Sequence, residues 1–187
     1  ENKKLIIGHS RLVTNSMKDN QPIYENNICV FHNGIITNFK TLFKKFNLKP
    51  KLQIDSEIIV SLINYGLKKN YDLNSLIEFI KKEIEGSASC VVTLLEIGKV
   101  ILFTNNGSLY FGKKNDSIYI SSEKFPLVKT NCFEIQKVNS TIIFDIPKND
   151  KKELIVNEIK IKRKNLLSDV NHNLLNDKFL NYEFNEK

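Results

Sequence analysis

The spacing of apolar residues changes along the chain, and this change predicts where strands give way to helices. Residues 4–10 and 27–33 are short runs rich in β-branched and apolar side chains, which is typical of strands. The segment between them, 11–26, contains Asp, Asn and Pro and predicts a loop. We therefore expect the first part of the chain to be β-structure interrupted by one long connection.

Helical periodicity begins at Thr37 or Asn38, and Asn38 is suited to cap the helix that follows. Two more helical stripes come after Asp55 and after Asp72. The three stripes consist of Phe39, Leu42, Phe43 and Phe46; of Ile58, Ile59, Leu62, Ile63 and Leu67; and of Leu73, Leu76, Ile77, Ile80 and Ile84.

A series of short apolar runs follows Gly86, separated by Gly, Asn and Lys, and predicts a strand meander with a brief helix at 122–127. The order of strands, helices and then more strands predicts an α+β sandwich rather than repeated βαβ units. Beyond Pro147 one last strand is plausible, and the remaining tail has the weak patterning of a linker. The predicted strands of the meander are 89–96, 99–105, 108–114, 117–123, 132–138 and 140–146.

Length and cysteine content narrow the class of protein. A chain of 187 residues suits one domain with a sizeable core, and no apolar run reaches membrane-spanning length. Cys29, Cys90 and Cys132 are far apart and form no CxxC pair, so the sequence predicts neither a disulfide framework nor a zinc site. Without a signal peptide pattern, we expect a reducing, cytoplasmic setting and no metal or other cofactor.

The net charge of +7 comes almost entirely from lysine, because Arg11 and Arg163 are the only arginines. The lysines are spread along the chain rather than interleaved with aromatic residues on one stripe. Nucleic-acid readers usually depend on arginine forks and aromatic platforms. A solvated basic surface is therefore favoured over an anion- or RNA-binding module, which ranks last among the alternatives.

Three polar stretches fall at predicted strand ends or helix starts, where side chains can converge on a site. They are GHSRLVT (8–14), VFHNGIITN (30–38) and IDSEII (54–59). Arg11 is suited to a bidentate grip on a carboxylate, or it is an ordinary surface arginine. Asp55 is suited either to cap the next helix or to receive the ammonium group of an amino acid. Thr14 offers a hydroxyl on the same loop as Arg11.

Asn33-Gly34 has two interpretations. Between two strands the pair would form a tight hairpin turn, but the residues after it pass into helical spacing rather than a returning strand. Alternatively, the Asn33 amide and the Gly34 N–H could donate together to an oxyanion, since glycine lets the backbone approach a ligand closely.

These stretches, together with QPI (21–23) and SLYFGKKNDSIYISSEKFPL (108–127), resemble the glutaminase domain of class II glutamine amidotransferases. The similarity is strongest to the glucosamine-6-phosphate synthase branch and spans roughly residues 5 to 146. The resemblance implies an αββα N-terminal-nucleophile hydrolase that releases ammonia from L-glutamine.

The resemblance also implies roles for individual residues. Arg11 and Thr14 would hold the carboxylate side of glutamine, and Asp55 its amino group. Asn33 and Gly34 would form the oxyanion hole, which displaces the hairpin interpretation. Two histidines, His9 and His32, would support the site by hydrogen bonding.

The nucleophile of that family is an N-terminal cysteine, which this chain does not carry at Glu1. We therefore expect residues 1–147 to be an N-terminally truncated amidotransferase domain, lacking its first strands and nucleophile and inactive by itself. An internal substitute is not expected, since Cys29 and His32 lie three apart on a strand and face opposite sides. Cys90 and Cys132 fall in apolar strand patterns and are expected in the core.

Residues 148–187 are expected to form a last strand and a linker toward an acceptor domain absent from the chain. KFLNYEFNEK (178–187) resembles the linker to a sugar isomerase domain, which implies fructose 6-phosphate as the ammonia acceptor and glucosamine 6-phosphate as product. A homo-oligomer formed through that domain is compatible with this arrangement. The alternatives are an asparagine synthetase-like, amidophosphoribosyltransferase-like or glutamate synthase-like enzyme, or an inactive glutamine-binding regulatory domain. No nucleic-acid or membrane partner is expected.

Overall fold

The computed structural model of the chain describes residues 6–9 and 21–146. Its elements form two antiparallel sheets, one in the strand order β1-β2-β3-β4-β8 and one in the order β6-β5-β7. The helices are α1 (Phe39–Lys45), α2 (Glu57–Lys68), α3 (Leu73–Glu83) and α4 (Lys124–Lys129). The strands are β1 (Ile23–Glu25), β2 (Ile28–Ile36), β3 (Gly86–Leu94), β4 (Lys99–Asn105), β5 (Tyr110–Lys114), β6 (Ser117–Ser121), β7 (Phe133–Lys137) and β8 (Ile142–Asp145).

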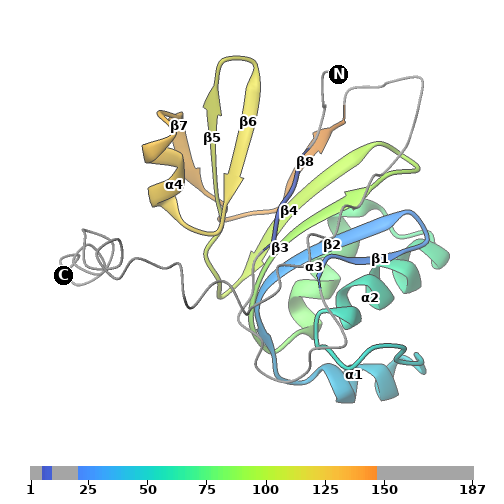
Figure 1. Ribbon diagram of the computed structural model, residues 1–187. Helices are drawn as coiled ribbons and strands as arrows, with labels where there is room; N and C mark the ends of the chain where they lie inside the picture. The colour runs from blue at the N-terminus through green and yellow to red at the C-terminus, as the bar shows by residue number, and fades with distance from the viewer. Residues whose placement is uncertain (1–5, 10–20, 147–187) are drawn as a thin grey trace, which may run out of the picture. The chain divides into compact units, whose positions relative to one another are not determined.

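Helices α1, α2 and α3 cover one face of the larger sheet (Figure 1). The apolar stripes of α2 and α3 pack against every second residue of β2, β3 and β4, because strand side chains alternate between the two faces. The helix-facing sheet residues in this main core include Val30, Ile36, Ala88, Cys90, Val92, Leu94, Ile101 and Phe103.

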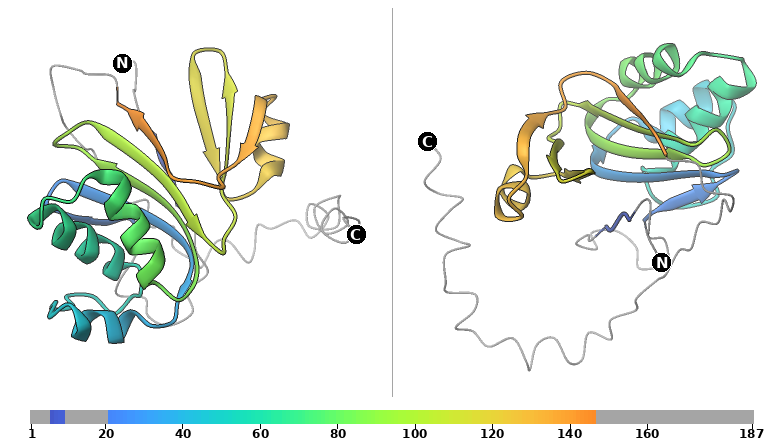
Figure 2. Two further views of the ribbon diagram at one scale, coloured as in Figure 1. Left: turned by 180° about the vertical axis from the view of Figure 1, so that it is seen from behind. Right: turned by 90° about the horizontal axis from the view of Figure 1, so that it is seen from above.

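A second apolar cluster lies on the opposite face of the larger sheet and joins it to the smaller one. Val91 and Leu102 from the larger sheet belong to the same cluster as Leu109 and Val138, and Phe111 of β5 packs edge-on against Phe144 of β8 with ring centroids 6.1 Å apart. Helix α4 covers the far side of the smaller sheet (Figure 2). The layers therefore follow the order helix, sheet, sheet, helix.

The predicted α+β sandwich is confirmed, but three local predictions near the start were wrong. Residues 6–9 are not in a strand, and the predicted loop contains β1, a strand of 3 residues. Strand β2 continues beyond the predicted end at Asn33 to Ile36. Short strands such as β1 carry too few residues to show alternation, and Asn-Gly is a signal that ordinarily ends a strand.

The residues before α1 and α3 differ in their role: Asn38 was predicted as a cap, whereas for Asp72 only its place before a helical stripe was noted. Asp72 caps α3, since its side chain accepts a hydrogen bond from Ser75 N at 3.0 Å. Asn38 occupies the cap position of α1 but makes no capping bond. Its amide instead donates to the carbonyl of Glu83 and accepts from Glu85 N, which ties the start of α1 to the end of α3.

Several predictions lie outside the described residues. These are the positions of Arg11 and Thr14 and the proposed last strand and linker at 148–187. Within 6–9 and 21–146, no helix has the length and apolarity needed to cross a bilayer.

The burial of leucines on α2 predicts how much each contributes to the free energy of unfolding. Leu62 on α2 is 0% exposed, whereas Leu67 on the same helix is 36% exposed. Leu62→Ala should lower the free energy of unfolding by about 2–5 kcal/mol, because it leaves a cavity where the core cannot collapse fully. Leu67→Ala should cost less than about 1 kcal/mol, since its side chain is partly in water already. Urea denaturation of both variants measures the difference, and equal effects would contradict this description of the core.

Candidate functional site

Strand β2 carries the site, because its alternation sends neighbouring residues to opposite faces of the larger sheet. Asn33 pairs with Ser89 of β3, and both side chains line the cavity between the sheets. His32 pairs with Cys90, which belongs to the core under the helices. Asn33 and Gly34 lie inside this continuous strand, so the hairpin interpretation is excluded.

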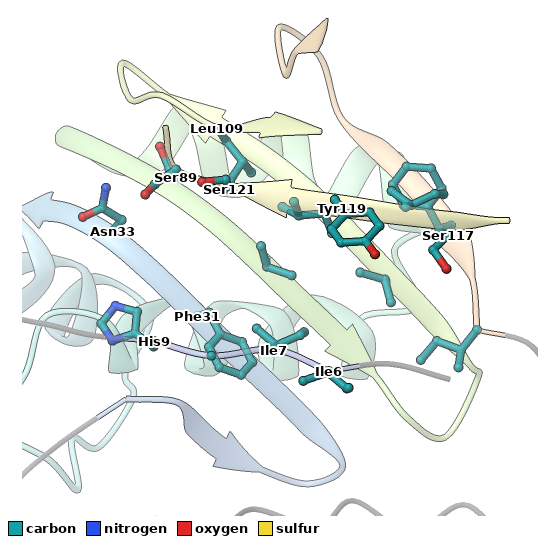
Figure 3. Close-up of a pocket in the computed structure, with 18 of the residues that line it drawn as sticks. Ile6, Ile7, His9, Phe31, Asn33, Ser89, Leu109, Ser117, Tyr119 and Ser121 are labelled. Atoms are coloured by element: carbon teal, nitrogen blue, oxygen red, sulfur yellow. The ribbon is translucent and has the colours of Figure 1, made fainter. Parts of the chain in front are cut away.

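The cavity has a volume of about 760 Å³ and is lined by both sheets and by residues 6–9. Figure 3 shows Asn33, Ser89 and Ser121 gathered at one end of it. Phe31 and Tyr119 belong to the rest of its wall, which mixes apolar side chains with polar ones such as Asp116 and Asp145. A cavity with both kinds of lining can bind a small ligand through a few polar groups.

One edge of β2 is only partly covered by a neighbouring strand. Strand β1 pairs with β2 at residues 28 to 30 and no farther. Beyond that point, side chains from separate segments bind the backbone of this edge. Gln21 Oε1 accepts from His32 N at 2.6 Å, His9 Nε2 lies 3.2 Å from the His32 carbonyl oxygen, and Asp55 Oδ2 accepts from Ile36 N at 2.7 Å.

Gly34 lies between His32 and Ile36, the two residues of β2 whose N–H groups are bound by side chains. In an antiparallel strand, alternate residues point their N–H groups toward the same side, so the Gly34 N–H faces the same edge as those of His32 and Ile36. Gly34 has φ +139°, a conformation that favours glycine, and a Cβ built there would come within 2.0 Å of the Ser87 carbonyl oxygen. The backbone donor is thus presented at a position where a side chain has no room.

Asp55 is not a helix cap, which excludes one of its two sequence interpretations. Ser56 is the residue at the N-cap of α2, and the Asp55 carboxylate reaches across to Ile36 of β2. A half-buried carboxylate is therefore held two residues beyond Gly34 along the same strand edge. That location places a negative charge near the predicted oxyanion donors.

The start of α2 is itself held by a buried acid. Glu57 is 2% exposed, and its two carboxylate oxygens accept from Lys51 N at 2.7 Å and from Leu52 N at 2.9 Å. Hydrogen bonds from backbone N–H groups stabilise a buried carboxylate. They also hold the loop before Asp55 against the helix.

The buried side chain of His32 contacts Ser56 and the backbone of Ser87. Its ring is 2% exposed, with Nδ1 2.9 Å from Ser56 Oγ and Nε2 3.5 Å from the Ser87 carbonyl oxygen. Burial lowers the pKa of His32, and the nearby Asp55 charge opposes this change without reversing it. The ring is therefore neutral near pH 7.

Two of the cysteines, Cys29 and Cys90, do not have the environment of a nucleophile. Burial raises the pKa of the Cys29 thiol to about 11 and raises that of Cys90 further. Cys29 pairs with Thr93 on the cavity side of the sheet, opposite to the face of His32, as predicted. Cys132 was expected in the core, but it is only partly buried and precedes β7.

The structure brings His9, His32, Asn33, Gly34 and Asp55 together around the edge of β2. In the described ranges, no group of three potential metal-ligating His, Cys, Asp or Glu side chains occurs. The sequence interpretation assigned no role to Gln21 and Ser56, which both contact the His32 segment. Their only sequence signal was their place inside the QPI and IDSEII stretches.

Comparisons with known proteins agree with this geometry. The model of a glutamine amidotransferase domain family matches residues 9–129. A glutamine–fructose-6-phosphate aminotransferase (isomerizing) of Chlamydia muridarum is 28% identical over 147 residues, covering 73% of this chain and 24% of the relative. One from Clostridium acetobutylicum is 32% identical over 126 residues, covering 63% of this chain and 20% of the relative. The chain thus spans about a quarter or less of the length of these relatives.

Solved structures show the same fold. The glutamine phosphoribosylpyrophosphate amidotransferase of B. subtilis aligns with a TM-score of 0.50 at 18% identity, covering 72% of this chain and 33% of that one. A regulatory enzyme of purine biosynthesis aligns with a TM-score of 0.51 at 20% identity, covering 67% and 29%. The predicted αββα fold of N-terminal-nucleophile hydrolases is confirmed.

Gly34 yields a prediction that depends only on its backbone. Gly34→Ala should lower the free energy of unfolding by about 2 kcal/mol or more, because the new methyl group collides with the Ser87 carbonyl and the conformation strains any other residue. Gly8→Ala is the matched control, since a Cβ at Gly8 meets nothing within 4 Å. Thermal unfolding of both variants measures this. A Gly34→Ala protein as stable as the control would refute the strand geometry described above.

Proposed function

The chain belongs to the glutamine amidotransferase domain family, and we propose that it forms the glutaminase site that hydrolyses L-glutamine to glutamate and ammonia. The observation that carries this proposal is the exposed edge of β2. There the Gly34 N–H lies between backbone groups bound by Gln21 and Asp55, with the Asn33 side chain facing the cavity.

In this mechanism a thiolate attacks the side-chain amide carbon of glutamine. The carbonyl oxygen then becomes an oxyanion that accepts hydrogen bonds from the Asn33 amide and the Gly34 N–H. Ammonia leaves, and water hydrolyses the resulting glutamyl thioester. Asp55 receives the substrate ammonium group, while Arg11 and Thr14 are proposed, by resemblance to the family, to bind the carboxylate.

The thiolate is proposed to come from a residue outside the 187-residue chain. Cys29 and Cys90 are buried with raised pKa values, and Cys132 lies near the smaller sheet rather than at Asn33. A buried neutral thiol is a poor nucleophile. We infer that the chain alone binds glutamine without turning it over. The free thiols also favour a cytoplasmic location.

The acceptor is proposed to be fructose 6-phosphate, giving glucosamine 6-phosphate in a sugar isomerase domain of the same parent protein. The names of the curated relatives support this choice. The alternatives are another amidotransferase branch, such as one resembling the phosphoribosylpyrophosphate enzyme, and an inactive domain that binds glutamine to regulate a partner.

Two substitutions separate substrate binding from transition-state stabilisation in the complete protein. Asp55→Ala should raise KM for glutamine strongly, because the ammonium group loses its counter-charge. Asn33→Ala should chiefly lower kcat, by about a hundredfold or more, because the amide donates most strongly to the developing oxyanion. Steady-state glutamate release measures both parameters. Small and equal effects from the two variants would remove the assigned roles.

The acceptor has a separate test in the complete protein. Incubation with ¹⁵N-amide glutamine and fructose 6-phosphate should yield ¹⁵N-labelled glucosamine 6-phosphate, measured by mass spectrometry. Unlabelled ammonium chloride in the same mixture is the control for transfer through bulk solvent. Labelled product from aspartate or phosphoribosylpyrophosphate instead would assign another branch. Glutamine binding without ammonia release would identify a regulatory domain.

A further inference from the structure

We propose that Gln21, His32 and Ser56 form a hydrogen-bonded ring that sets the position of the oxyanion donors relative to Asp55. The proposal deepens the proposed glutaminase function and rests on it. It makes Gln21 and Ser56 positioning residues, since they act through their neighbours rather than on the substrate.

The ring is closed by three contacts. His32 N donates to Gln21 Oε1 at 2.6 Å, Gln21 Nε2 donates to Ser56 Oγ at 3.0 Å, and Ser56 Oγ lies 2.9 Å from His32 Nδ1. The three residues come from three separate segments: the connection before β1, the middle of β2 and the start of α2. Ser56 is 1% exposed and His32 2% exposed, so their mutual contact is shielded from water, whereas Gln21 is partly exposed.

The contact of His32 Nε2 with the Ser87 carbonyl, at 3.5 Å, favours one tautomer of His32. The Ser87 carbonyl can only accept, so in that tautomer His32 Nε2 carries the proton and Nδ1 accepts. The single hydrogen of the Ser56 hydroxyl must then point to Nδ1, and a lone pair of the same oxygen receives the Gln21 amide. Gln21 Oε1 completes the ring by accepting from the His32 backbone.

Two members of the ring, His32 and Ser56, are adjacent in sequence to residues of the proposed site. Asn33 follows His32 on β2, and Asp55 precedes Ser56 at the start of α2. A second contact, from Asp55 to Ile36 N, joins the same two elements farther along the strand. Two contacts along one strand restrict both the distance and the angle between β2 and the end of α2, whereas one contact would leave a hinge.

The His32 position lies on the face of the sheet opposite to Asn33, although His32 also borders the cavity. His32 and its partner Cys90 point to the main core, while Asn33 points to the cavity on the other face of the sheet. A loss of the ring should therefore misplace the donors without removing any contact to glutamine. Misplacement of a catalytic group by about 1 Å can cost about a hundredfold in rate.

The test compares three variants of the complete protein. Ser56→Ala breaks the ring, Ser56→Thr keeps the hydroxyl, and Ser61→Ala removes a hydroxyl from the same helix as a matched control. Rates are expressed per active site, with sites counted by covalent labelling with a diazo-ketone analogue of glutamine, so that misfolded protein does not contribute. Gln21→Met provides a second way to break the ring if Ser56→Ala does not fold.

Ser56→Ala should lower kcat by about ten- to a hundredfold with KM for glutamine changed less than about threefold. Ser56→Thr should recover most of the loss, and ¹⁵N NMR of His32 should show Nε2 protonated in the wild type but a changed Nδ1 signal in Ser56→Ala. Per-site kinetics equal to those of Ser61→Ala, or a wild-type His32 protonated on Nδ1, would overturn the proposal. A wild-type protein without glutaminase activity would instead overturn the proposed function, and with it the catalytic purpose of the ring.

Discussion

The interruption of the sheet beside β2 is the constraint on which the site depends. Backbone N–H and C=O groups shielded from water need hydrogen-bond partners, yet β1 covers only the first residues of this edge. Farther along, side chains bind the backbone of two residues, with Gln21 and His9 at His32 and Asp55 at Ile36. Satisfying one strand edge therefore draws together segments that are far apart in sequence. The Gly34 N–H, which we propose as a donor to the oxyanion, lies between His32 and Ile36 on the same edge.

The two faces of the larger sheet carry different parts of the proposed site. On one face, Asn33 and Ser89 meet the cavity. On the other face, His32 is buried, kept neutral by its surroundings and in contact with Ser56. A neutral imidazole suits this place, because an imidazolium would add a buried positive charge beside the core. In the proposed site, the cavity face with Asn33 binds the polar substrate. The buried face with His32 fixes the position of β2 relative to the start of α2.

The sequence predicted the parts of the structure that repeat. The stripes of α2 and α3 follow the helical period closely, and the meander of strands alternates around regular turn residues. The Asn33-Gly34 and Asp55 predictions needed the resemblance to a family, because a turn and a helix cap are the ordinary local interpretations of such residues. Gln21 and Ser56 lay beyond prediction, since a single polar residue shows its partner only after the chain folds. The roles of Arg11 and Thr14 remain predictions.

The pairing of β2 with β3 has a consequence for how this segment can evolve. Nine consecutive residues of β2 face nine of β3 in unbroken register, and consecutive side chains alternate between cavity and core. Removing or adding one residue between Ile28 and His32 would reverse that alternation on one side of the change. If the part after the change were reversed, the His32 imidazole would face the cavity and Asn33 would enter the apolar interior. The number of residues in this segment is therefore constrained in addition to the identity of residues such as Gly34.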